Sequence, residues 1–561
     1  MEEVVAAAPK QAKVRWHTLE HRGVAFPPTY QPRGITISIR GEKLALNADQ
    51  EELIYTWAKK KDTHYVQDPV FQSNFLLDLK PLLPEKFRKV DIKISDFDLS
   101  QAFRLADEEK VMKERDKERV KNLPREEKKK ISEAKKAERE RLKAFYGKAV
   151  VDGQEVDIAN WLVEPPGLFM GRGQHPLRGR WKPRVSPQDV TLNLGRDAPV
   201  PEGAWKEIVH DQTSTWLATW IEKLTDKRKY VWLHDSAAIR QDNDRAKYEK
   251  AKKLAEQLPK IEKEIIRRMK NSGDRAATAA YLIFKLAMRV GDEKDPDEAD
   301  TVGASTLRVE HIKFPQANGR QQIEFNFLGK DSVPWQKTLD VTSEDTHALH
   351  DNLKKFMKGK KPDEPIFDDI NSRKVNAFFQ TIMPGLTAKV FRTCIATKVV
   401  QQAFVNSPIK VEKNSPEPDK IYVAKSANLK AAIECNHKKG VDPKNPAAKK
   451  ATEKFEEAVA KKNEAIASLE RDLAARKWKT ELQERRLSER LAKMKMQLKL
   501  QQETRDYNLG TSLRNYIDPR VMKAWLNHVE LDWTKVYTAT LQRKFKWVED
   551  YHDKNYARFY L

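Results

Sequence analysis

Alternating apolar and polar residues near the amino end of the chain predict a β-hairpin at residues 34–46. The sequence there is GITISIRGEKLAL, in which the RGEK stretch supplies the turn between two alternating halves. The preceding residues 16–33 are rich in proline and aromatic side chains, which predicts an ordered extended segment. Residues 48–100 show a helical pattern that is interrupted at two prolines and around Asp96.

Charged residues dominate residues 104–146, and apolar residues are sparse there. Pro124 divides the stretch, so the pattern predicts two helices whose faces are mostly in contact with solvent. A charged exposed face without a site is the favoured interpretation, and a basic arm beside a nucleic-acid channel is the alternative.

The pattern changes to strands and loops at residues 150–240 and returns to helix at residues 247–291. Within the helical stretch, YLIFKLAM is apolar on nearly all sides, which predicts a buried helix. The sequence IEFNFLGKDSVPW at residues 323–335 alternates and then turns, which predicts a hairpin with residues 329–332 at its tip. Residues 345–437 are expected to be largely helical.

Residues 447–506 contain no glycine or proline, and their apolar residues recur mostly at three- and four-residue steps. Lysine, arginine, glutamate and glutamine fill most other positions, which is a coiled-coil signature. Two antiparallel helices would bury the apolar stripe against itself, so we favour a hairpin with a turn near residues 476–480. A short, aromatic-rich unit follows from Tyr507. The whole pattern predicts an α+β multidomain protein.

Composition narrows the class of protein. The chain has 561 residues, too many for one core, and about three or four units are expected. Its two cysteines, Cys394 and Cys435, exclude a disulfide scaffold and are expected to be buried. No apolar run approaches a membrane span, and the acidic start MEEVVAAAPK does not resemble a signal peptide. We therefore expect an intracellular protein in a reducing compartment.

The charge balance points to a polyanionic partner. Lysine and arginine number 106 against 83 acidic residues, which gives a formal net charge of +23. Nucleic acid is the first candidate and an anionic membrane surface is the second. A basic protein without such a partner is the plain alternative.

Familiar catalytic motifs are absent from the sequence. It has no GxxxxGK[ST] phosphate loop, no HExxH and no paired CxxC, so nothing indicates ATP use or a zinc site. Cys435 and His437 are near neighbours but supply at most two ligands, so no bound metal is expected. Five candidate catalytic residues remain, most of them at the ends of predicted helices and strands. Each of them taken singly also has an ordinary structural explanation. They are Arg289, Lys330, Arg392, His437 and Tyr516.

Taken together, these five residues stand in segments that resemble those of the eukaryotic type IB DNA topoisomerases. The segments are LEHRGVAFPP, EPPGLFMGRGQHP, TWLATW, KLAMRVGDEKD, EADTVGASTLRVEHI, FLGKDS, GLTAKVFRT, ECNHKKG and LGTSLRNYIDPRV. The resemblance extends from about Trp16 to the carboxyl end, and the long N-terminal region of many relatives is missing. Tyrosine recombinases share the Arg/Lys/Arg/His/Tyr set but neither these surrounding segments nor the charged linker.

The resemblance implies a role for each candidate. Tyr516 would attack one DNA strand and form a 3′-phosphotyrosyl bond, and the freed 5′-hydroxyl would reseal the strand after rotation has relaxed the superhelical strain. Arg289 and Arg392 suit the charge that builds on the phosphate oxygens, and His437 adds a hydrogen bond. Lys330 suits a general acid for the leaving oxygen. We expect no cofactor: fixed cations replace Mg²⁺, the phosphotyrosyl bond conserves energy without ATP, and water takes the phenol proton.

The resemblance also implies duplex DNA as partner, held mostly by phosphate contacts with weak sequence preference. Arg172, Asp331 and Asn515 match the family's site for camptothecin-type inhibitors. The other expected DNA contacts are Trp216, Lys229, Tyr230, Lys247, Thr301, Asn376, Thr387, Ala388, Lys389 and Thr511.

The architecture implied by the resemblance is a bilobed clamp around DNA with a mostly helical, tyrosine-recombinase-like catalytic domain. A monomeric nuclear enzyme is expected, although no targeting signal is identified. The expected parts are a disordered tail (1–15), core subdomain I (16–32 and 130–237), core subdomain II (33–129), the catalytic core subdomain III (238–437), an antiparallel coiled-coil linker (438–505) and a small helical C-terminal domain with the nucleophile (506–561).

The sequence departs from the family pattern at Met170, in RGRWKPRV and, most importantly, beside Arg392. Where relatives usually read FRTYNAS this chain has FRTCIAT, so Cys394 and Ile395 replace a polar pair beside Arg392. This departure leaves open a catalytically impaired DNA-binding clamp. The shared Arg/Lys/Arg/His/Tyr set leaves open a tyrosine recombinase-like enzyme that exchanges strands.

Overall fold

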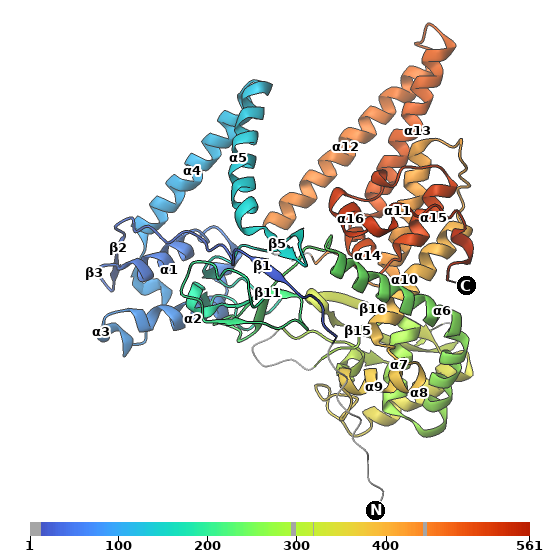
Figure 1. Cartoon of the computed structure of the whole chain (residues 1–561), viewed down its shortest axis with the longest axis horizontal. Coiled ribbons are helices and arrows are strands. Elements are labelled where there is room, and N and C mark those ends of the chain that lie inside the picture. Colours follow the sequence, from blue (N-terminus) through green and yellow to red (C-terminus); the bar gives the residue numbers. More distant parts are fainter. Residues whose placement is uncertain (1–12, 293–298, 318, 441–445, 561) are drawn as a thin grey trace, which may run out of the picture. The chain divides into compact units, whose positions relative to one another are not determined.

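The computed structural model describes residues 13–292, 299–317, 319–440 and 446–560 (Figure 1). Contacts divide the chain into two compact units, which are described separately below. One unit comprises Met1–Gly171 and Pro176–Gln241, and the other comprises Arg172–His175 and Asp242–Leu561. The tail predicted at residues 1–15 lies almost entirely outside the described residues.

The first unit combines short strands with five helices in its described residues and contains two separate hydrophobic cores. Its helices are α1 (Ala48–Ala58), α2 (Pro69–Leu79), α3 (Glu85–Arg88), α4 (Ser100–Asn122) and α5 (Arg125–Tyr146). Its strands are β1 (Leu19–His21), β2 (Thr36–Ile39), β3 (Glu42–Ala45), β4 (Phe97–Asp98), β5 (Lys148–Val151), β6 (Gln154–Asp157), β7 (Gly167–Leu168), β8 (Trp181–Lys182), β9 (Thr191–Asn193), β10 (Glu207–Val209), β11 (Trp216–Ile221) and β12 (Arg228–Trp232).

The predicted amino-terminal hairpin is confirmed by β2 and β3, in which Ile39 pairs with Glu42 across the turn. Alternation places Ile37 and Ile39 on the buried face of this hairpin. Helix α1 covers the same core, where the Trp57 and Phe75 rings stack 4.2 Å apart. The first core of this unit therefore joins the hairpin to α1 and α2.

Helices α4 and α5 form the pair of charged helices expected on either side of Pro124. They run away from the rest of the first unit and back toward it as a hairpin (Figure 1). In α4 only Ala102 and Ala106 are buried, near the helix start, and most other described side chains are exposed. The prediction of two solvated helices is confirmed.

The second core of the first unit lies beneath a four-stranded sheet of order β10-β9-β11-β12. Leu192 of β9 and Val231 of β12 are fully buried there, together with Trp16 from the extended amino-terminal segment. Strands β1, β5 and β6 form a second sheet. The strands expected at residues 150–240 are present.

The second unit is largely helical and holds the largest hydrophobic core. Its helices are α6 (Ala238–Ser272, nearly all in this unit), α7 (Arg275–Leu286), α8 (Glu344–Met357), α9 (Ser372–Ile382), α10 (Ala388–Val405), α11 (Glu417–Glu434), α12 (Pro446–Ala474), α13 (Glu481–Glu503), α14 (Leu509–Asn515), α15 (Pro519–His528) and α16 (Ala539–Lys544). Its strands are β13 (Ile312–Lys313), β14 (Gln316–Ala317), β15 (Arg320–Gly329) and β16 (Val333–Asp340).

The helical stretch predicted at residues 247–291 is present as two helices, and its predicted bounds are wrong. Helix α6 begins earlier and continues through Pro259, a residue that usually breaks a helix interior. The chain then turns at Gly273, with φ of 58°, and restarts as α7 where the Asp274 side chain accepts hydrogen bonds from two backbone N–H groups. Helix α7 stops at Leu286 because the next residue, Ala287, is left-handed, with φ of 50°. The buried character predicted for this helix is confirmed.

Strands β15 and β16 form the hairpin predicted at residues 323–335. Gly329 pairs with Val333, so the predicted tip at residues 329–332 is confirmed. Phe327 and Trp335 stack with their ring centroids 4.9 Å apart on the buried face of the hairpin. This packing fixes the base of the tip against the core.

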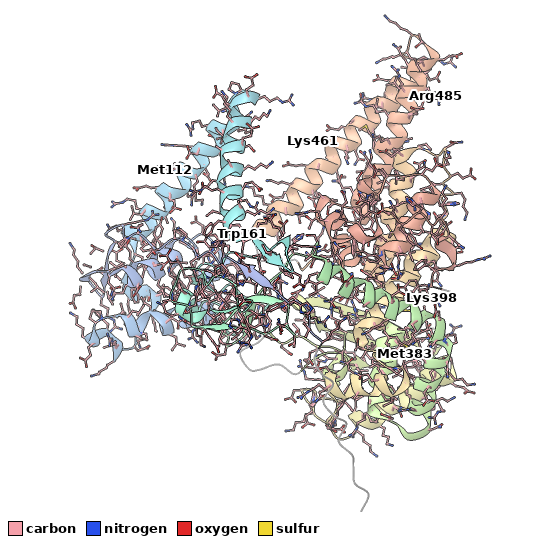
Figure 2. The ribbon with its side chains drawn as sticks, in the orientation of Figure 1. Met112, Trp161, Met383, Lys398, Lys461 and Arg485 are labelled. Carbon is pink, nitrogen blue, oxygen red and sulfur yellow. The ribbon has the colours of Figure 1, made fainter. Side chains whose placement is uncertain are left out.

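Helices α12 and α13 run antiparallel, since a contact further along α12 joins a residue less far along α13. Lys462 Nζ donates to Gln501 Oε1 at 2.8 Å, and Lys495 Nζ lies 2.6 Å from Glu470 Oε1. The connection occupies residues 475–480, which confirms the predicted hairpin turn. Exposed charged side chains project along both helices, including the labelled Lys461 and Arg485 of Figure 2. The coiled-coil assignment stays a prediction.

Composition predicted two buried cysteines and no membrane span. Both Cys394 and Cys435 are buried free thiols, as predicted. Across the described ranges, no helix combines the length and apolar character needed to cross a membrane.

Candidate active site

Tyr516 lies in the short link between α14 and α15. The backbone N–H groups of Tyr516 and Ile517 both donate to Ser512 O at 3.0 Å, which closes α14. Asp518 then caps α15, because its side chain accepts from the backbone N–H of Arg520. These caps fix the link on both sides, and the Tyr516 side chain is left only 7% exposed.

Arg289 reaches Tyr516 from the segment that follows α7. Its Nη1 donates a hydrogen bond to Tyr516 Oη at 3.1 Å. The backbone carbonyl of Arg289 accepts from Ala304 N at 2.8 Å, so the segment is anchored to the described range that begins at residue 299. A side chain at Gly303 would collide with Gly291, whose backbone lies 2.5 Å from the ideal Cβ position. The glycines of RVGDE and TVGAS therefore permit the close backbone approach that holds Arg289.

Arg392 lies in the second turn of α10 and is almost completely buried. It donates to the carbonyl of Ala287 and, through Nη2, to the carbonyl of Cys435 at 2.9 Å. The guanidinium carbon lies 5.1 Å from the centre of the Tyr516 ring. Its Nε is buried and has no hydrogen-bond partner in the described part of the chain. Arg392 is thus fixed by backbone oxygens, and its Nε is a buried donor that no described residue satisfies.

His437 follows the end of α11 and stacks on Tyr516 with a centroid distance of 5.0 Å. Its Nδ1 lies 2.7 Å from Ser512 Oγ, and its Nε2 lies 3.4 Å from Arg392 Nη2. Because arginine nitrogens only donate, we assign Nε2 as the acceptor and Nδ1–H as the donor to Ser512. The histidine in this state is neutral.

Charge and burial set the protonation of the two rings. Burial, with help from Arg392 and Arg289, lowers the pKa of His437 to about 3. Burial alone would raise the pKa of Tyr516, but the two guanidinium groups outweigh it and lower that pKa below its usual value. The site therefore favours a neutral imidazole beside a phenol that ionises readily.

Lys330 lies at the tip of the β15–β16 hairpin and is exposed. Asp331 and Ser332 at this tip have φ of 66° and 56°, in the left-handed region. Arg172 forms an ion pair with Asp331, and Gly173 packs directly against Ser332. The Lys330 side chain forms no ion pair or hydrogen bond with any described residue. The structure thus brings Arg289, Arg392, His437 and Tyr516 together and leaves Lys330 on the adjoining tip.

Other predicted contact residues of the second unit surround the tyrosine segment or the start of α10. Lys247 is largely buried, and its Nζ donates to Asp244 at 3.1 Å and to the carbonyl of Asn515 at 3.3 Å. Burial lowers the pKa of this lysine. Asn376 accepts from Ala388 N at 3.0 Å and so caps the helix start formed by Thr387, Ala388 and Lys389. Thr511 lies in the first turn of α14. Thr301 lies near the start of the described range 299–317.

The remaining predicted contacts lie in the first unit. Trp216 begins β11, and Lys229 and Tyr230 lie on the neighbouring β12. The Tyr230 ring lies 6.3 Å from that of Trp216 and 5.2 Å from that of Trp232. Lys229 Nζ lies 3.6 Å from Glu222 Oε2. Lys229 and Tyr230 are neighbours on the edge strand β12, so their side chains project from opposite faces of the sheet, and Trp216 lies on the adjacent strand β11.

Several polar residues around Tyr516 were not predicted from the sequence. Ser512 orients His437, and Thr397 of α10 contacts the tyrosine backbone. Both are fully buried. A signal was present for Thr397, since it is a polar residue within a mostly apolar helix four positions from Thr393, but spacing alone could not show its partner.

Three family models match successive parts of the chain. "Eukaryotic DNA topoisomerase I, DNA binding fragment" matches residues 14–233, "Eukaryotic DNA topoisomerase I, catalytic core" matches residues 236–473, and "C-terminal topoisomerase domain" matches residues 488–558. The first two cover most of the described elements before α13, and the third contains Tyr516.

Full-length relatives extend this similarity. The chain is 35% identical over 554 residues to DNA topoisomerase 1 of Drosophila melanogaster, covering 97% of this chain and 55% of the relative. It is 36% identical over 566 residues to DNA topoisomerase 1 of Caenorhabditis elegans, covering 96% and 67%. It is 34% identical over 576 residues to the Homo sapiens DNA topoisomerase 1, covering 97% and 72%. The chain thus spans between about half and three quarters of the length of these relatives.

All of these matches are to one class of protein, the DNA topoisomerases. Within that class, the chain belongs to the eukaryotic DNA topoisomerase I family.

Proposed function

We propose that this chain is a type IB DNA topoisomerase, an isomerase that relaxes positive and negative supercoils without ATP. The single observation that carries the proposal is the buried tyrosine whose Oη accepts from Arg289 while Arg392 lies against its ring. Two arginines beside one phenol suit attack on a phosphodiester, and family membership supports the same reaction.

The proposed reaction begins with Tyr516 as the nucleophile. Its phenolate oxygen bonds to the phosphorus of one DNA strand, and the bond from phosphorus to the 5′-oxygen breaks. Arg289 and Arg392 stabilise the negative charge on the non-bridging oxygens. The lowered pKa of Tyr516 supports proton loss to water without a dedicated base.

Lys330 completes the proposed cycle as the general acid. The leaving 5′-oxygen takes a proton from its ammonium group, which yields a 5′-hydroxyl and a 3′-phosphotyrosyl bond. Exposure at a hairpin tip suits this role, because the ammonium group is accessible to a DNA strand. Rotation then relaxes the strain, and the hydroxyl attacks the phosphotyrosyl bond to reseal the strand with no Mg²⁺ or ATP consumed.

Duplex DNA is the proposed partner of both units. DNA contacts would come from Trp216, Lys229 and Tyr230 in the first unit and from the residues around α10 and α14 in the second. We further propose that α12 and α13 act as the coiled-coil linker, that the enzyme works as a nuclear monomer, and that a camptothecin-type inhibitor binds beside Arg172, Asp331 and Asn515. The Arg172–Asp331 ion pair supports the last point.

The replacement of the family's usual polar pair by Cys394 and Ile395 does not disturb the hydrogen bonds that hold Arg392. Cys394 is buried in the core, and the carbonyls that hold Arg392 belong to Ala287 and Cys435. An active enzyme is therefore favoured over an impaired clamp.

The test is relaxation of positively and negatively supercoiled plasmid in EDTA without ATP. The wild-type chain should relax both, and Tyr516→Phe should relax neither while still binding DNA. Binding without relaxation by the wild type would indicate the impaired clamp. Products with exchanged arms would indicate a recombinase.

A further inference from the structure

Helix α10 carries three buried polar residues at four-residue spacing in an otherwise largely apolar sequence. Thr393, Thr397 and Gln401 are each at most 1% exposed, and the spacing places them on one face of the helix. Buried polar groups are costly unless they are hydrogen-bonded, so this face must have partners. It contacts the chain on both sides of the nucleophilic link.

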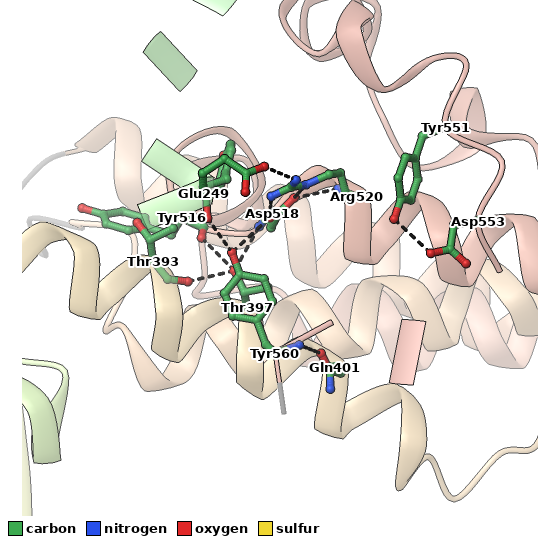
Figure 3. Close-up of polar contacts among 11 residues, drawn as sticks. Glu249, Thr393, Thr397, Gln401, Tyr516, Asp518, Arg520, Tyr551, Asp553 and Tyr560 are labelled. Atoms are coloured by element: carbon green, nitrogen blue, oxygen red, sulfur yellow. Dashed lines mark hydrogen bonds and ion pairs between the residues drawn. The ribbon is translucent and has the colours of Figure 1, made fainter. Parts of the chain in front are cut away.

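Thr397 is the member that touches the nucleophile's own backbone. Its Oγ1 accepts from the backbone N–H of Asp518 at 3.0 Å and lies 3.3 Å from the carbonyl oxygen of Tyr516. The hydroxyl proton is directed to Thr393 O at 2.8 Å or shared with the tyrosine carbonyl. Figure 3 shows Thr397 between Tyr516 and Asp518. One side chain therefore holds both ends of the link that carries the nucleophile.

A buried cluster fixes the far side of Asp518. Its carboxylate is fully buried and accepts from Arg520 Nε at 3.1 Å and Nη2 at 2.8 Å. The hydroxyl of Tyr560 lies 3.0 Å from the same carboxylate, and Gln401 accepts from the Tyr560 backbone N–H at 2.7 Å. The polar face of α10 is thus joined to the tyrosine link directly through Thr397 and again through the C-terminal segment.

We propose that Thr397 is a positioning residue that fixes where the Tyr516 side chain lies relative to the Arg392 guanidinium. Both Arg392 and Thr397 lie on α10, so one rigid helix presents the guanidinium and holds the backbone of the group it must face. This inference rests on the proposed function, because it assigns the positioning of the nucleophile in that reaction. Small displacements of a reacting group cost much of the rate, so the hydroxyl matters although it touches no reacting atom.

Thr397→Val tests the proposal, because valine keeps the shape and removes the hydroxyl. Single-turnover formation of the covalent adduct on a nicked DNA duplex should slow about tenfold to a hundredfold. DNA affinity should stay unchanged, and Thr397→Ser should restore the rate. Thr393→Val is the matched control, since it removes an equally buried hydroxyl whose own bond goes to Lys389 O on the same helix. This control should cleave at the wild-type rate.

A second readout does not depend on DNA. In protein with ¹³C at tyrosine Cζ, the NMR titration of Tyr516, assigned by comparison with Tyr516→Phe, should move to higher pH in Thr397→Val but not in Thr393→Val. If Thr397→Val does not fold, Thr397→Ala takes its place in both experiments. A wild-type rate and titration in the Thr397 variants, or equal losses in Thr393→Val, would overturn the positioning role. Absence of any adduct from the wild type would instead defeat the proposed function, and the titration would still decide the positioning role.

Discussion

Arg289 Nη1 donates a hydrogen bond to Tyr516 Oη at 3.1 Å, which joins a segment after α7 to a link 227 residues further along the chain. A permanently charged donor favours the ionised phenol, and Arg392 adds to this effect from the ring face. The unperturbed pKa of tyrosine is about 10, so the arrangement raises the phenolate fraction near neutral pH. The same guanidinium groups suit a phosphate that would arrive beside the phenol.

Replacing Arg289 with glutamine should therefore affect both the rate and its pH dependence. In the wild type, the rate of adduct formation should rise with pH and level off below pH 10, as the phenol ionises. Arg289→Gln should move this rise to higher pH and lower the plateau about 10²–10³-fold, because one transition-state donor is lost. Arg289→Lys is the control that keeps a charge, and its profile should shift less. A rise at the same pH in Arg289→Gln would contradict the assigned cause.

His437 should make the folded protein sensitive to acid. Its pKa of about 3 lies below the ordinary value near 6.5, so the unfolded chain takes up the proton first as pH falls. The stability this histidine contributes is complete above pH 6.5 and is lost progressively down to about pH 3. At pH 5 the loss in free energy of unfolding is about 2 kcal/mol.

Chemical denaturation of the wild type and of His437→Gln measures this loss. The stability difference between the two proteins should shrink by that amount between pH 7 and pH 5. His21→Gln in the first unit provides a comparison, because burial also lowers the pKa of His21, to about 4. A difference that stays constant with pH would show that His437 is not held neutral.

Lys330 should be dispensable when the leaving group needs no proton. Lys330→Ala should slow cleavage of ordinary DNA about 10²–10⁴-fold, which is the range for general acid catalysis. DNA with sulfur at the bridging 5′ position leaves as a thiolate, so the same variant should cleave it at nearly the wild-type rate. Lys337→Ala is the control in the same hairpin, since Lys337 is paired with Glu434, and sulfur should not change its relative rate. Equal defects on both substrates would exclude Lys330 as the acid.

The tip of the α12–α13 hairpin should affect rotation and leave cleavage intact. The Lys495–Glu470 pair and the buried residues Ile466 and Leu498 mark the part below the tip, so residues 471–494 can be replaced by a short glycine linker. We expect an unchanged rate of adduct formation and faster strand rotation, measured on single supercoiled molecules. Unchanged rotation would show that the hairpin does not slow the turning DNA.

Much of the fold could be predicted because its signals are local. Pro124 between two charged runs and the alternation before Lys330 both predicted elements that the structure contains. The helical pattern at residues 247–291 included Pro259, but the start of α6 at Ala238 and its end before Gly273 were not predicted. The burial of Tyr248 and Ile265 on either side of Pro259 outweighs the local cost of the proline. Tertiary packing decided that helix.

Part of the candidate site could likewise be predicted from the sequence, and part could not. The five predicted residues could be named because their segments resemble one family, and four of them meet in the structure. Ser512 carries no distinctive pattern, and the position of Thr397 in a mostly apolar helix does not show its partner. Their roles arise from contacts across 75 and 119 residues, which the sequence could not name. The electrostatic state of Tyr516 likewise depends on distances that no sequence pattern states.

The central claim is that Tyr516 is the nucleophile, and mapping the covalent adduct tests it most directly. The wild-type chain would be incubated with DNA in EDTA, denatured, digested with protease and nuclease, and analysed by mass spectrometry. We predict a single modified peptide that carries a 3′-linked nucleotide on the Tyr516 oxygen and is absent from Tyr516→Phe. A nucleotide on any other residue, or an adduct that persists in Tyr516→Phe, would contradict the account.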